Sequence, residues 1–429
     1  MLSTGAPLSE WLAWLETLSP KEIDLGLDRV SDVLARLNLT RPDHVLLIAG
    51  TNGKGSSVTM AAALLCAAGH RVGAYTSPHI SRFNERIVVD GRMVSDAEII
   101  AAFETVEVAR KGTELTYFEF STLAAATIYA ALDLDVWILE VGLGGRLDAT
   151  NVIDPTASLI TNISLDHCDW LGHDIEAIGH EKAGVMRPAK PTIFGGHEMP
   201  DAVRKHAAAI GADLFSPGHG FSVAASASGD WDWAGPSQRL ESLQPPGLVG
   251  AFQIDNAAAV LALLDVAGLM DGIDDALVNR VLPHISLAGR AQRLEREGRE
   301  WLLDVAHNPA AAEMLATTLA SSSTPRQTIA IVGLLDDKDV AGVIGPLTGH
   351  VDQWVVMAAE SHRAVAADEL GRQISNLADK ACFVADSVVT AIDFARRSSS
   401  KNDRILVTGS FSTVGPVLDQ LATMSRPNQ

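Results

Sequence analysis

The sequence contains little of several residue types, and each scarcity excludes a class of protein. Its 429 residues include only three cysteines, Cys66, Cys168 and Cys382, which lie far apart. An odd number of scattered cysteines, with no Cys-x-x-Cys pair, excludes a disulfide framework and a cysteine-based zinc ribbon, and it favours a reducing compartment. The longest apolar stretches, such as Leu123–Leu132, stop well short of the roughly 20 residues that cross a bilayer. No basic segment followed by an apolar run opens the chain. We therefore expect a cytoplasmic protein without a membrane partner.

Positive charge is also scarce. The chain has 33 Lys and Arg against 53 Asp and Glu, which gives a net charge of -20. Nucleic-acid backbones and anionic membranes are bound by clustered positive charge, so this balance argues against both as partners. Small anionic substrates are not excluded, because they respond to a local field. With 47% apolar and 20% charged residues, the chain has the composition of a globular protein with a large core.

The first two thirds of the sequence alternate short apolar runs with helical patterns. Buried strands separated by amphipathic helices predict parallel βαβ units in a doubly wound sheet. The expected strands are His44–Ala49, Arg71–Thr76, Asp135–Val141, Ala157–Ile163 and Pro191–Phe194. The expected helices are Ser56–Ala68, Phe118–Leu132, Asp174–Met186 and Phe252–Leu269. Residues 216–250 are rich in Gly, Ser and Pro, and there we expect a small antiparallel excursion or a long loop.

A composition shift at Pro283–Gly289 indicates a hinge, after which the alternation of strands and helices restarts. The expected strands there are Glu300–Val305, Thr328–Val332, Gln353–Met357, Cys382–Val384 and Arg404–Val407. About 140 residues with five strands make one complete α/β domain. The predicted fold class is therefore α/β, with a P-loop-containing doubly wound N-terminal domain (1–285) and a smaller Rossmann-like C-terminal domain (290–429) that meet at a cleft.

A glycine-rich segment, GTNGKGS at residues 50–56, lies between the first expected strand and an alanine-rich helix. Glycines let backbone N–H groups close around a phosphate, the helix N-terminus adds positive potential, and Lys54 can reach the outer phosphates. The spacing is shorter than that of the common P-loop. The alternative is a plain glycine-rich turn that opens a helix, and the strand–loop–helix context favours the phosphate site.

Polar residues follow three further strands, at the edge where open α/β sheets bind ligands. Glu140 ends one strand and is suited to Mg²⁺, which prefers oxygen ligands. Asp166-His167 follows the next, with Lys182 downstream in GHEKAGVM, and Asp304–Pro309 (DVAHNP) follows the first strand of the second domain. Each group has a structural alternative, namely a helix cap, a salt bridge or a buried histidine. Together they favour one magnesium–nucleotide site.

Six strings carry a resemblance: GTNGKGS, TYFEFSTL, ILEVGLGGRLDATN, SLDHCDWLG, EKAGVMRP and DVAHNP. In this order they resemble the folylpolyglutamate synthases of the Mur ligase family over nearly the whole chain. The segment Ile23–Leu27 resembles the part of the bacterial bifunctional form that contacts dihydropteroate. The resemblance implies a monomeric ATP-dependent ligase that joins L-glutamate to dihydropteroate and to reduced folates. It also implies an acyl-phosphate intermediate and release of ADP and phosphate.

The resemblance also assigns site residues. The ATP-binding set is Thr51, Asn52, Gly53, Lys54, Gly55, Ser56, Asn256, Arg290 and Asp304. Two Mg²⁺ ions would be held by Ser77, Glu140 and His167. Lys182 matches a lysine that is carbamylated in this family; Lys54 and Lys182 are expected to be catalytic, with His307 as base for the glutamate amine. The pterin site would be lined by Asp24, Leu25, Gly26, Thr116, Tyr117, Phe118, Glu119, Leu147, Asp148 and Ala149.

Two departures from the family pattern and two alternative functions accompany this hypothesis. The hinge reads Ala288-Gly289 where Pro-Gly is usual, and Ser412 stands where related sequences often carry His, which affects the expected glutamate contacts. One alternative is a Mur-type amino-acid ligase acting on a UDP-sugar precursor, which usually has a further domain before the phosphate loop. The other is a P-loop ATPase without ligase chemistry, which would not need DVAHNP or the pterin-like strings.

Overall fold

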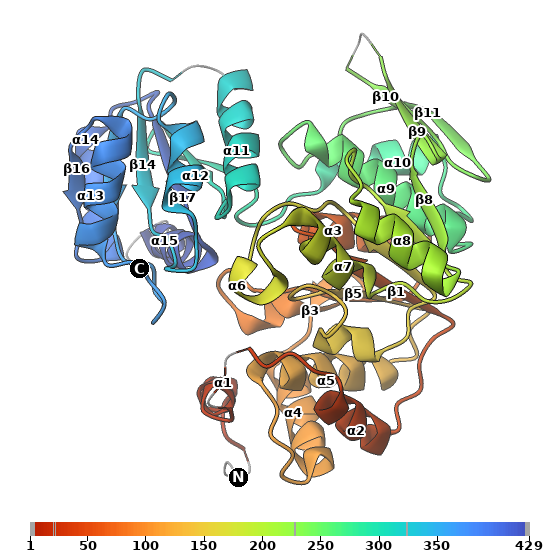
Figure 1. Cartoon of the computed structure of the whole chain (residues 1–429). Coiled ribbons are helices and arrows are strands. Elements are labelled where there is room, and N and C mark those ends of the chain that lie inside the picture. Colours follow the sequence, from red (N-terminus) through yellow and green to blue (C-terminus); the bar gives the residue numbers. More distant parts are fainter. Residues whose placement is uncertain (1–4, 20, 22, 227–228, 323–324, 425–429) are drawn as a thin grey trace.

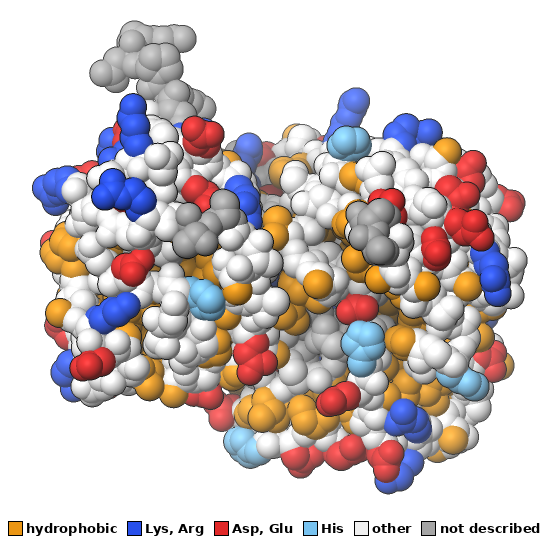
Figure 2. Space-filling model, turned by 90° about the horizontal axis from the view of Figure 1, so that it is seen from above, with side chains coloured by type: hydrophobic (Ala, Val, Ile, Leu, Met, Phe, Trp, Pro, Cys, Tyr) orange, Lys and Arg blue, Asp and Glu red, His pale blue; other side chains and the backbone are white. Residues whose placement is uncertain are grey.

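The computed structural model describes residues 5–19, 21, 23–226, 229–322 and 325–424, which form two α/β lobes (Figure 1). The larger lobe is built on an 11-stranded sheet and the smaller on a 6-stranded sheet. Both sheets carry helices on both faces, so the predicted two-domain, doubly wound α/β class is confirmed. Seen from above, the lobes meet along a furrow (Figure 2). The exact domain limits of 1–285 and 290–429 stay a prediction.

The larger sheet is parallel in its centre, from β8 to β2, and antiparallel at both edges. From edge to edge its strands are β11 (Arg239–Leu243), β10 (Trp231–Ala234), β9 (Gly220–Ala225), β8 (Asp213–Pro217), β7 (Pro191–Phe194), β6 (Ala157–Ile160), β1 (His44–Ala49), β5 (Val136–Glu140), β2 (Val72–Tyr75), β3 (Ile87–Val89) and β4 (Arg92–Met93). The central strands are buried on both faces, which explains their nearly continuous apolar sequences.

Two hydrophobic cores cover the faces of this sheet. One contains side chains of α3 (Lys54–Ala67), α9 (Phe252–Val266) and α10 (Asp275–Val281). The other contains side chains of α1 (Leu8–Glu16), α2 (Asp28–Leu37), α4 (Asp96–Arg110), α5 (Tyr117–Ala130), α7 (Ile175–Ala183) and α8 (Asp201–Ile210). The short segments between them are α6 (Cys168–Leu171), η1 (Phe83–Arg86), η2 (Ala149–Val152) and η3 (Leu282–His284).

The predicted elements of this lobe are largely confirmed, with one instructive difference. The expected strand over 157–163 ends at Ile160, because the chain then leaves the sheet to support the phosphate loop: Thr161 Oγ1 donates to the carbonyl of Asn52 at 2.6 Å. Of the two expectations for residues 216–250, the antiparallel excursion is confirmed, because β9, β10 and β11 pair antiparallel. Trp231 and Trp233 alternate with aspartates there because their rings are buried under α9.

The smaller sheet is parallel except at one edge. Its order is β12 (Gln292–Arg296), β13 (Arg299–Leu303), β17 (Arg404–Thr408), β14 (Thr328–Val332), β15 (Gln353–Val356) and β16 (Cys382–Val384). One face packs against α11 (Pro309–Ser321), α12 (Val340–Ile344), the turn η4 (Gly345–Leu347) and α13 (Ala367–Ala378), and the other against α14 (Val388–Ser398) and α15 (Phe411–Met424). The five predicted strands are present; β12 was not predicted, because its polar sequence QRLER lies at an exposed edge. Among the described residues, no helix has the length and apolar character needed to cross a membrane.

Candidate active site

A cavity of about 530 Å³ lies between the two lobes, at the carboxyl ends of their central strands. The larger lobe contributes the phosphate loop after β1, Glu140 at the end of β5, and the segment that follows β6. The smaller lobe contributes residues that follow β13, β14 and β17. The rule that open α/β sheets bind ligands beyond their strand ends therefore holds for both sheets at once.

The phosphate loop has the conformation that its glycines were expected to allow. Gly50 and Gly53 have φ values of 142° and 85°, which side chains disfavour. A Cβ atom at Gly50 would also lie 1.8 Å from Thr161 Oγ1. Lys54 begins α3, and its Nζ donates to the carbonyls of Gly50 and Thr51 at 3.0 and 3.1 Å. The loop is thus folded back on its own lysine, with the start of α3 facing the cavity.

Two of the three predicted metal ligands are in direct contact. The backbone N–H of Ser77 donates to Glu140 Oε2 at 3.1 Å. Burial raises the pKa of Glu140, and the nearby charge of Lys54 opposes this rise. Burial also lowers the pKa of Lys54, which Glu140 and Asp166 oppose. The cavity therefore buries a carboxylate and an ammonium group that stabilise each other's charge.

Lys182 is buried beside the phosphate loop. Its Nζ donates to the carbonyl of Gly50 at 2.9 Å. A residue of α7 therefore contacts the phosphate loop that follows β1. Burial, with a smaller contribution from the charge of Lys54, lowers the pKa of Lys182 to about 7. A large fraction of this amine is therefore neutral near pH 7, in contrast to an ordinary lysine.

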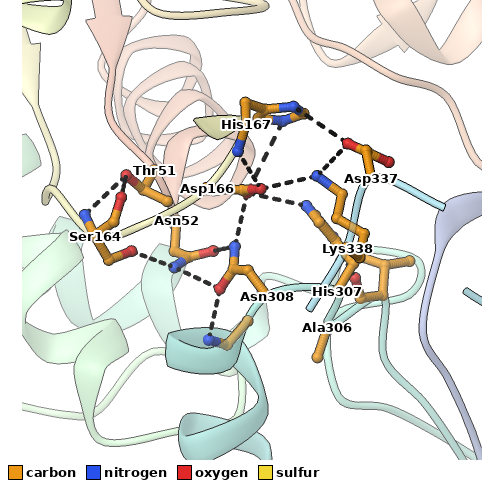
Figure 3. A network of polar contacts seen from close by, with 12 residues as sticks. Thr51, Asn52, Ser164, Asp166, His167, Ala306, His307, Asn308, Asp337 and Lys338 are labelled. Atoms are coloured by element: carbon orange, nitrogen blue, oxygen red, sulfur yellow. Dashed lines mark hydrogen bonds and ion pairs between the residues drawn. The ribbon is translucent and has the colours of Figure 1, made fainter. Parts of the chain in front are cut away.

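Asp166 joins the two lobes (Figure 3). Its carboxylate accepts hydrogen bonds from Lys338 Nζ at 2.8 Å and from Asn308 Nδ2 at 2.9 Å, both in the smaller lobe. Burial alone would raise the pKa of Asp166. The hydrogen bond and charge of His307, together with His167 and Lys338, outweigh burial and hold the pKa well below its ordinary value. Asp166 is therefore ionised and shared by several donors.

The two predicted histidines lie in this network, and their contacts differ. Burial, assisted by the charge of Lys338, lowers the pKa of His167 to about 4, so its ring is neutral and has a lone pair to offer. His307 Nδ1 lies 2.8 Å from the carbonyl of Val305, and its Nε2 lies 3.5 Å from Asp166 Oδ2. Both ring nitrogens of His307 thus face acceptors. The role of His307 as base for the glutamate amine stays a prediction.

The residues predicted to reach the nucleotide from the hinge surround a second, smaller cavity of about 50 Å³. Arg290 and Asp304 line it together with Asn52, Gly53 and the apolar side chains of Val249, Phe252 and Leu315. Asp304 accepts from the backbone N–H groups of Ala291 and Ala306, both at 2.8 Å. Asn256 packs against Gly53, where an added Cβ would lie 2.6 Å from its Oδ1. The fold therefore brings together the residues that were predicted to bind ATP.

Several residues predicted to line the pterin site have structural partners. Thr116 and Glu119 form a capping box at the start of α5, and Arg29 Nη2 binds Glu119 Oε1 at 3.0 Å. Arg29 also binds Asp24, with 2.7 Å between Nη1 and Oδ2. Asp148 caps η2 and is buried. The other predicted residues of this site are buried (Ala149) or half-buried (Leu25, Gly26, Tyr117, Phe118 and Leu147).

Sequence reasoning missed several residues of the cavity wall, among them Asp337, Lys338 and Arg86. Asp337 and Lys338 follow β14 and form an ion pair at 3.1 Å, next to Asp166. The strand-end rule, applied to the segment GLLDDKD, would have found them. Arg86 lies at the end of η1, outside any strand end or motif that could have pointed to it.

The donor set around Glu140 fits a divalent cation. Glu140 Oε2 accepts the Ser77 N–H, and the carboxylate is buried in the cavity wall. Carboxylate and hydroxyl oxygens are the ligands that Mg²⁺ and Mn²⁺ prefer, and a neutral imidazole can join them. A bound cation would also remove the penalty that burial imposes on the Glu140 carboxylate. His167 contacts Asp166 rather than Glu140, so the fold places the third predicted ligand in the neighbouring cluster.

Comparisons with known proteins cover both lobes. Residues 48–264 match the Mur ligase middle domain, and residues 289–411 match the Mur ligase glutamate ligase domain. Over 419 residues, the chain is 41% identical to the dihydrofolate synthase/folylpolyglutamate synthase of Escherichia coli K12, which covers 97% of this chain and 96% of that protein.

Solved structures agree with this similarity. E. coli FolC in complex with DHPP and ADP matches with a TM-score of 0.91 at 39% identity, over 99% of this chain and 100% of that one. A bifunctional folylpolyglutamate synthase/dihydrofolate synthase with Mn, AMPPNP and L-glutamate bound matches with a TM-score of 0.89 at 39% identity, over 98% and 99% of the two chains.

Proposed function

The chain belongs to the Mur ligase family, and we propose that its interlobe cavity joins L-glutamate to the carboxylate of dihydropteroate and of reduced folates, with hydrolysis of ATP to ADP and phosphate. One observation carries this proposal. A phosphate loop, a buried carboxylate suited to a metal ion and a lysine with a pKa of about 7 line one cavity with residues of the glutamate ligase domain. Relatives with this activity are similar over both domains. A UDP-sugar ligase and a simple ATPase are less favoured for the same reason.

The nucleotide would bind across the two cavities. The smaller one, with its apolar walls and the Asp304 carboxylate, suits the adenosine, and the phosphate loop suits the phosphates. Arg290 lines both cavities and would contact the nucleotide where they join. Asp304 is held by two backbone N–H groups, so its carboxylate is already oriented before the nucleotide arrives.

Divalent cations would be held by Ser77, Glu140 and His167, and we propose two of them. When bound, they neutralise negative charge on the phosphates and polarise the transferring group. Lys182 would carry a carbamate, an anionic group that can orient a cation or substrate. The lowered pKa supports this, because only the neutral amine attacks CO₂. The hydrogen bond from Nζ to the Gly50 carbonyl holds the amine at the rim of the phosphate loop.

A carboxylate is a poor electrophile, so the reaction must activate it first. A carboxylate oxygen attacks the γ-phosphorus, the bond to the β-phosphate breaks, and ADP leaves an acyl phosphate behind. Lys54 is placed to stabilise the charge on the transferred group. The neutral amine of glutamate then attacks the acyl carbon, and the tetrahedral intermediate loses phosphate to give the amide. We propose His307, which lines the cavity, as the base that takes the amine proton.

The pterin would enter from the larger lobe. We propose that Tyr117, Phe118 and Leu147 contact it directly, because they are only partly buried. The segment 24–26 would be positioned by the Arg29 ion pairs with Asp24 and Glu119, and Asp148 and Ala149 would shape the wall from behind. We also propose that the enzyme acts as a monomer, since the cavity is completed by the two lobes of one chain.

A two-substrate assay tests this function. Dihydropteroate or tetrahydrofolate is supplied with ATP, Mg²⁺ and radiolabelled glutamate, and both labelled product and nucleotide are measured. We expect ADP, not AMP, to form only when the pteridine substrate and glutamate are both present. Formation of AMP and pyrophosphate would refute the acyl-phosphate route. Turnover of a UDP-sugar substrate instead would favour the cell-wall alternative.

A further inference from the structure

Arg86 is a buried cation in the cavity wall that the mechanism above does not use. It ends η1, directly before β3, and only 8% of the residue is exposed. Its guanidinium carbon lies 5.6 Å from the ring centre of Phe83 and 5.4 Å from that of Tyr117. Its backbone is fixed as well, because the Arg86 carbonyl accepts from Thr76 N at 2.9 Å. The side chain is therefore held in one place at the surface of the cavity.

The charge of Arg86 has no anionic partner among the described residues. Its side-chain hydrogen bond runs from Nε to His79 Nδ1 at 2.8 Å. His79 Nδ1 accepts this hydrogen bond, and an imidazole supplies no negative charge that could balance the guanidinium. Buried cations are normally paired with carboxylates, because desolvating an isolated charge is costly. The Nη side of the guanidinium is left for an anion that arrives from the cavity.

The surroundings select the kind of anion. The guanidinium lies beside the half-buried ring of Tyr117, one of the residues proposed to contact the pterin, so an aromatic acid bound there would have a ring next to the cation. The Arg86 charge also acts on Glu140, the carboxylate predicted to bind metal near the phosphates. Lys338, on the opposite lobe, is already occupied by Asp166 and Asp337. Arg86 is thus a cation of the larger lobe that contacts Tyr117 and lines the same cavity as Glu140.

We propose that Arg86 binds the carboxylate of the pteridine substrate, the group that accepts the phosphoryl, and holds it toward the γ-phosphate. This inference rests on the proposed function and adds a specificity residue to it. A hydrogen bond to one carboxylate oxygen leaves the other free to attack phosphorus. Arg86 also favours an acid over a neutral analogue of the same shape, because a neutral ligand would leave the buried guanidinium without a counter-charge.

Equilibrium binding separates this role from a structural one. Isothermal titration in the presence of Mg²⁺ and a non-hydrolysable ATP analogue compares dihydropteroate with its carboxamide. We expect the wild type to bind the acid about 10- to 100-fold more tightly than the amide, the range of one charge-assisted hydrogen bond. Arg86→Gln should lose this preference and bind the amide within about 3-fold of wild type. Arg82→Gln is the matched control, because the Arg82 side chain is 70% exposed four residues away, and it should keep the preference.

Two further measurements make each result decisive. Thermal unfolding checks that Arg86→Gln is folded, and if it unfolds early, Arg86→Lys decides, since it keeps the charge and should keep part of the preference. The inference is overturned if Arg86→Gln still prefers the acid, or if a folded variant loses acid and amide equally. A wild type that binds neither ligand would refute the proposed function as well. A wild type that prefers the acid while Arg86→Gln does the same would remove only the role of Arg86.

Discussion

Lys182 allows the sharpest test of how burial prepares this site for chemistry. The amine is surrounded by protein and its Nζ donates to the Gly50 carbonyl at 2.9 Å. If its lowered pKa serves carbamate formation, the enzyme needs CO₂ as well as its substrates. Lys182→Ala should lose about 10²-fold or more in kcat, the scale of removing one electrostatic stabiliser from an active site. Short carboxylates such as acetate or formate should restore part of the activity, because they can occupy the vacated space.

The magnitude follows from the acid–base equilibrium. With a pKa of about 7, about three quarters of Lys182 is neutral at about pH 7.5, against about one part in a thousand for a lysine at the ordinary value of 10.5. Burial thus raises the reactive fraction several hundred-fold. Enzyme stripped of CO₂ should regain activity on addition of bicarbonate, at a rate that, for a constant concentration of dissolved CO₂, rises with pH and levels off above about pH 7 to 8.

The lowered pKa of Lys182 also makes the stability of the folded protein depend on pH. Because folding lowers the pKa of Lys182, the unfolded chain binds more protons than the folded one between about pH 7 and 10.5. Without CO₂, stability contributed by this group is therefore absent near pH 7 and increases as the pH rises through that window. Lys182→Met should remove the increase and unfold no earlier than wild type near neutral pH, which shows that lost activity is not lost folding.

Carbon-13 NMR of the enzyme in labelled bicarbonate provides the direct measurement. A carbamate resonance should appear in wild type and be missing in Lys182→Met. The reasoning is refuted if no resonance appears, bicarbonate does not restore stripped enzyme, and carboxylates do not rescue Lys182→Ala. A reactivation profile with its midpoint near 10.5 would show that burial does not shift this lysine.

Three further predictions test the rest of the site. Glu140→Gln keeps the side-chain size but removes the buried charge, so Mn²⁺ titration should show weaker metal binding and kcat should fall about 10²- to 10³-fold; unchanged metal affinity would place the cation elsewhere. Lys338→Met leaves Asp166 buried without its closest cation, which should cost about 3–5 kcal/mol of stability. The loss is measured as a lower unfolding temperature or as a higher KM for ATP. Adding Asp166→Asn should be milder than the sum of the two single changes, and strict additivity would contradict the pairing. Gly50→Ala should abolish nucleotide binding because its Cβ would meet Thr161, whereas Gly69→Ala, also at positive φ but in open space, should cost only stability.

Much of the site could be predicted because its residues follow strand ends. Glu140, Asp166 and Asp304 were found by this rule, and the fold places each at the cavity or its rim. Lys338 follows β14 in the same way and was overlooked. Arg86 could not be found so, because it belongs to a single turn, and only its contacts with His79 and two rings reveal its position.

For other residues the structure shows a role that the sequence analysis had not assigned. Thr116 and Glu119 were assigned to the pterin wall by resemblance, which stays a prediction, and they also cap α5, a role that the spacing T-x-x-E predicts. The expected strand beyond Ile160 failed because Thr161 supports the phosphate loop instead of the sheet. The apolar pattern beyond Ile160 was compatible with two uses, and this long-range contact selected one.

By itself, the sequence determined the α/β class, the succession of strands along the chain and the chemistry available at each strand end, because these depend on local periodicity and residue type. Only the tertiary structure decided which strand ends face each other. Asp166 meets Lys338, 172 residues away, and Asn52 meets Asn308, 256 residues away. The protonation states followed from the same step. The lowered pKa of Lys182 and of His167 arises from burial between elements that are distant along the chain, and no local pattern contains that information.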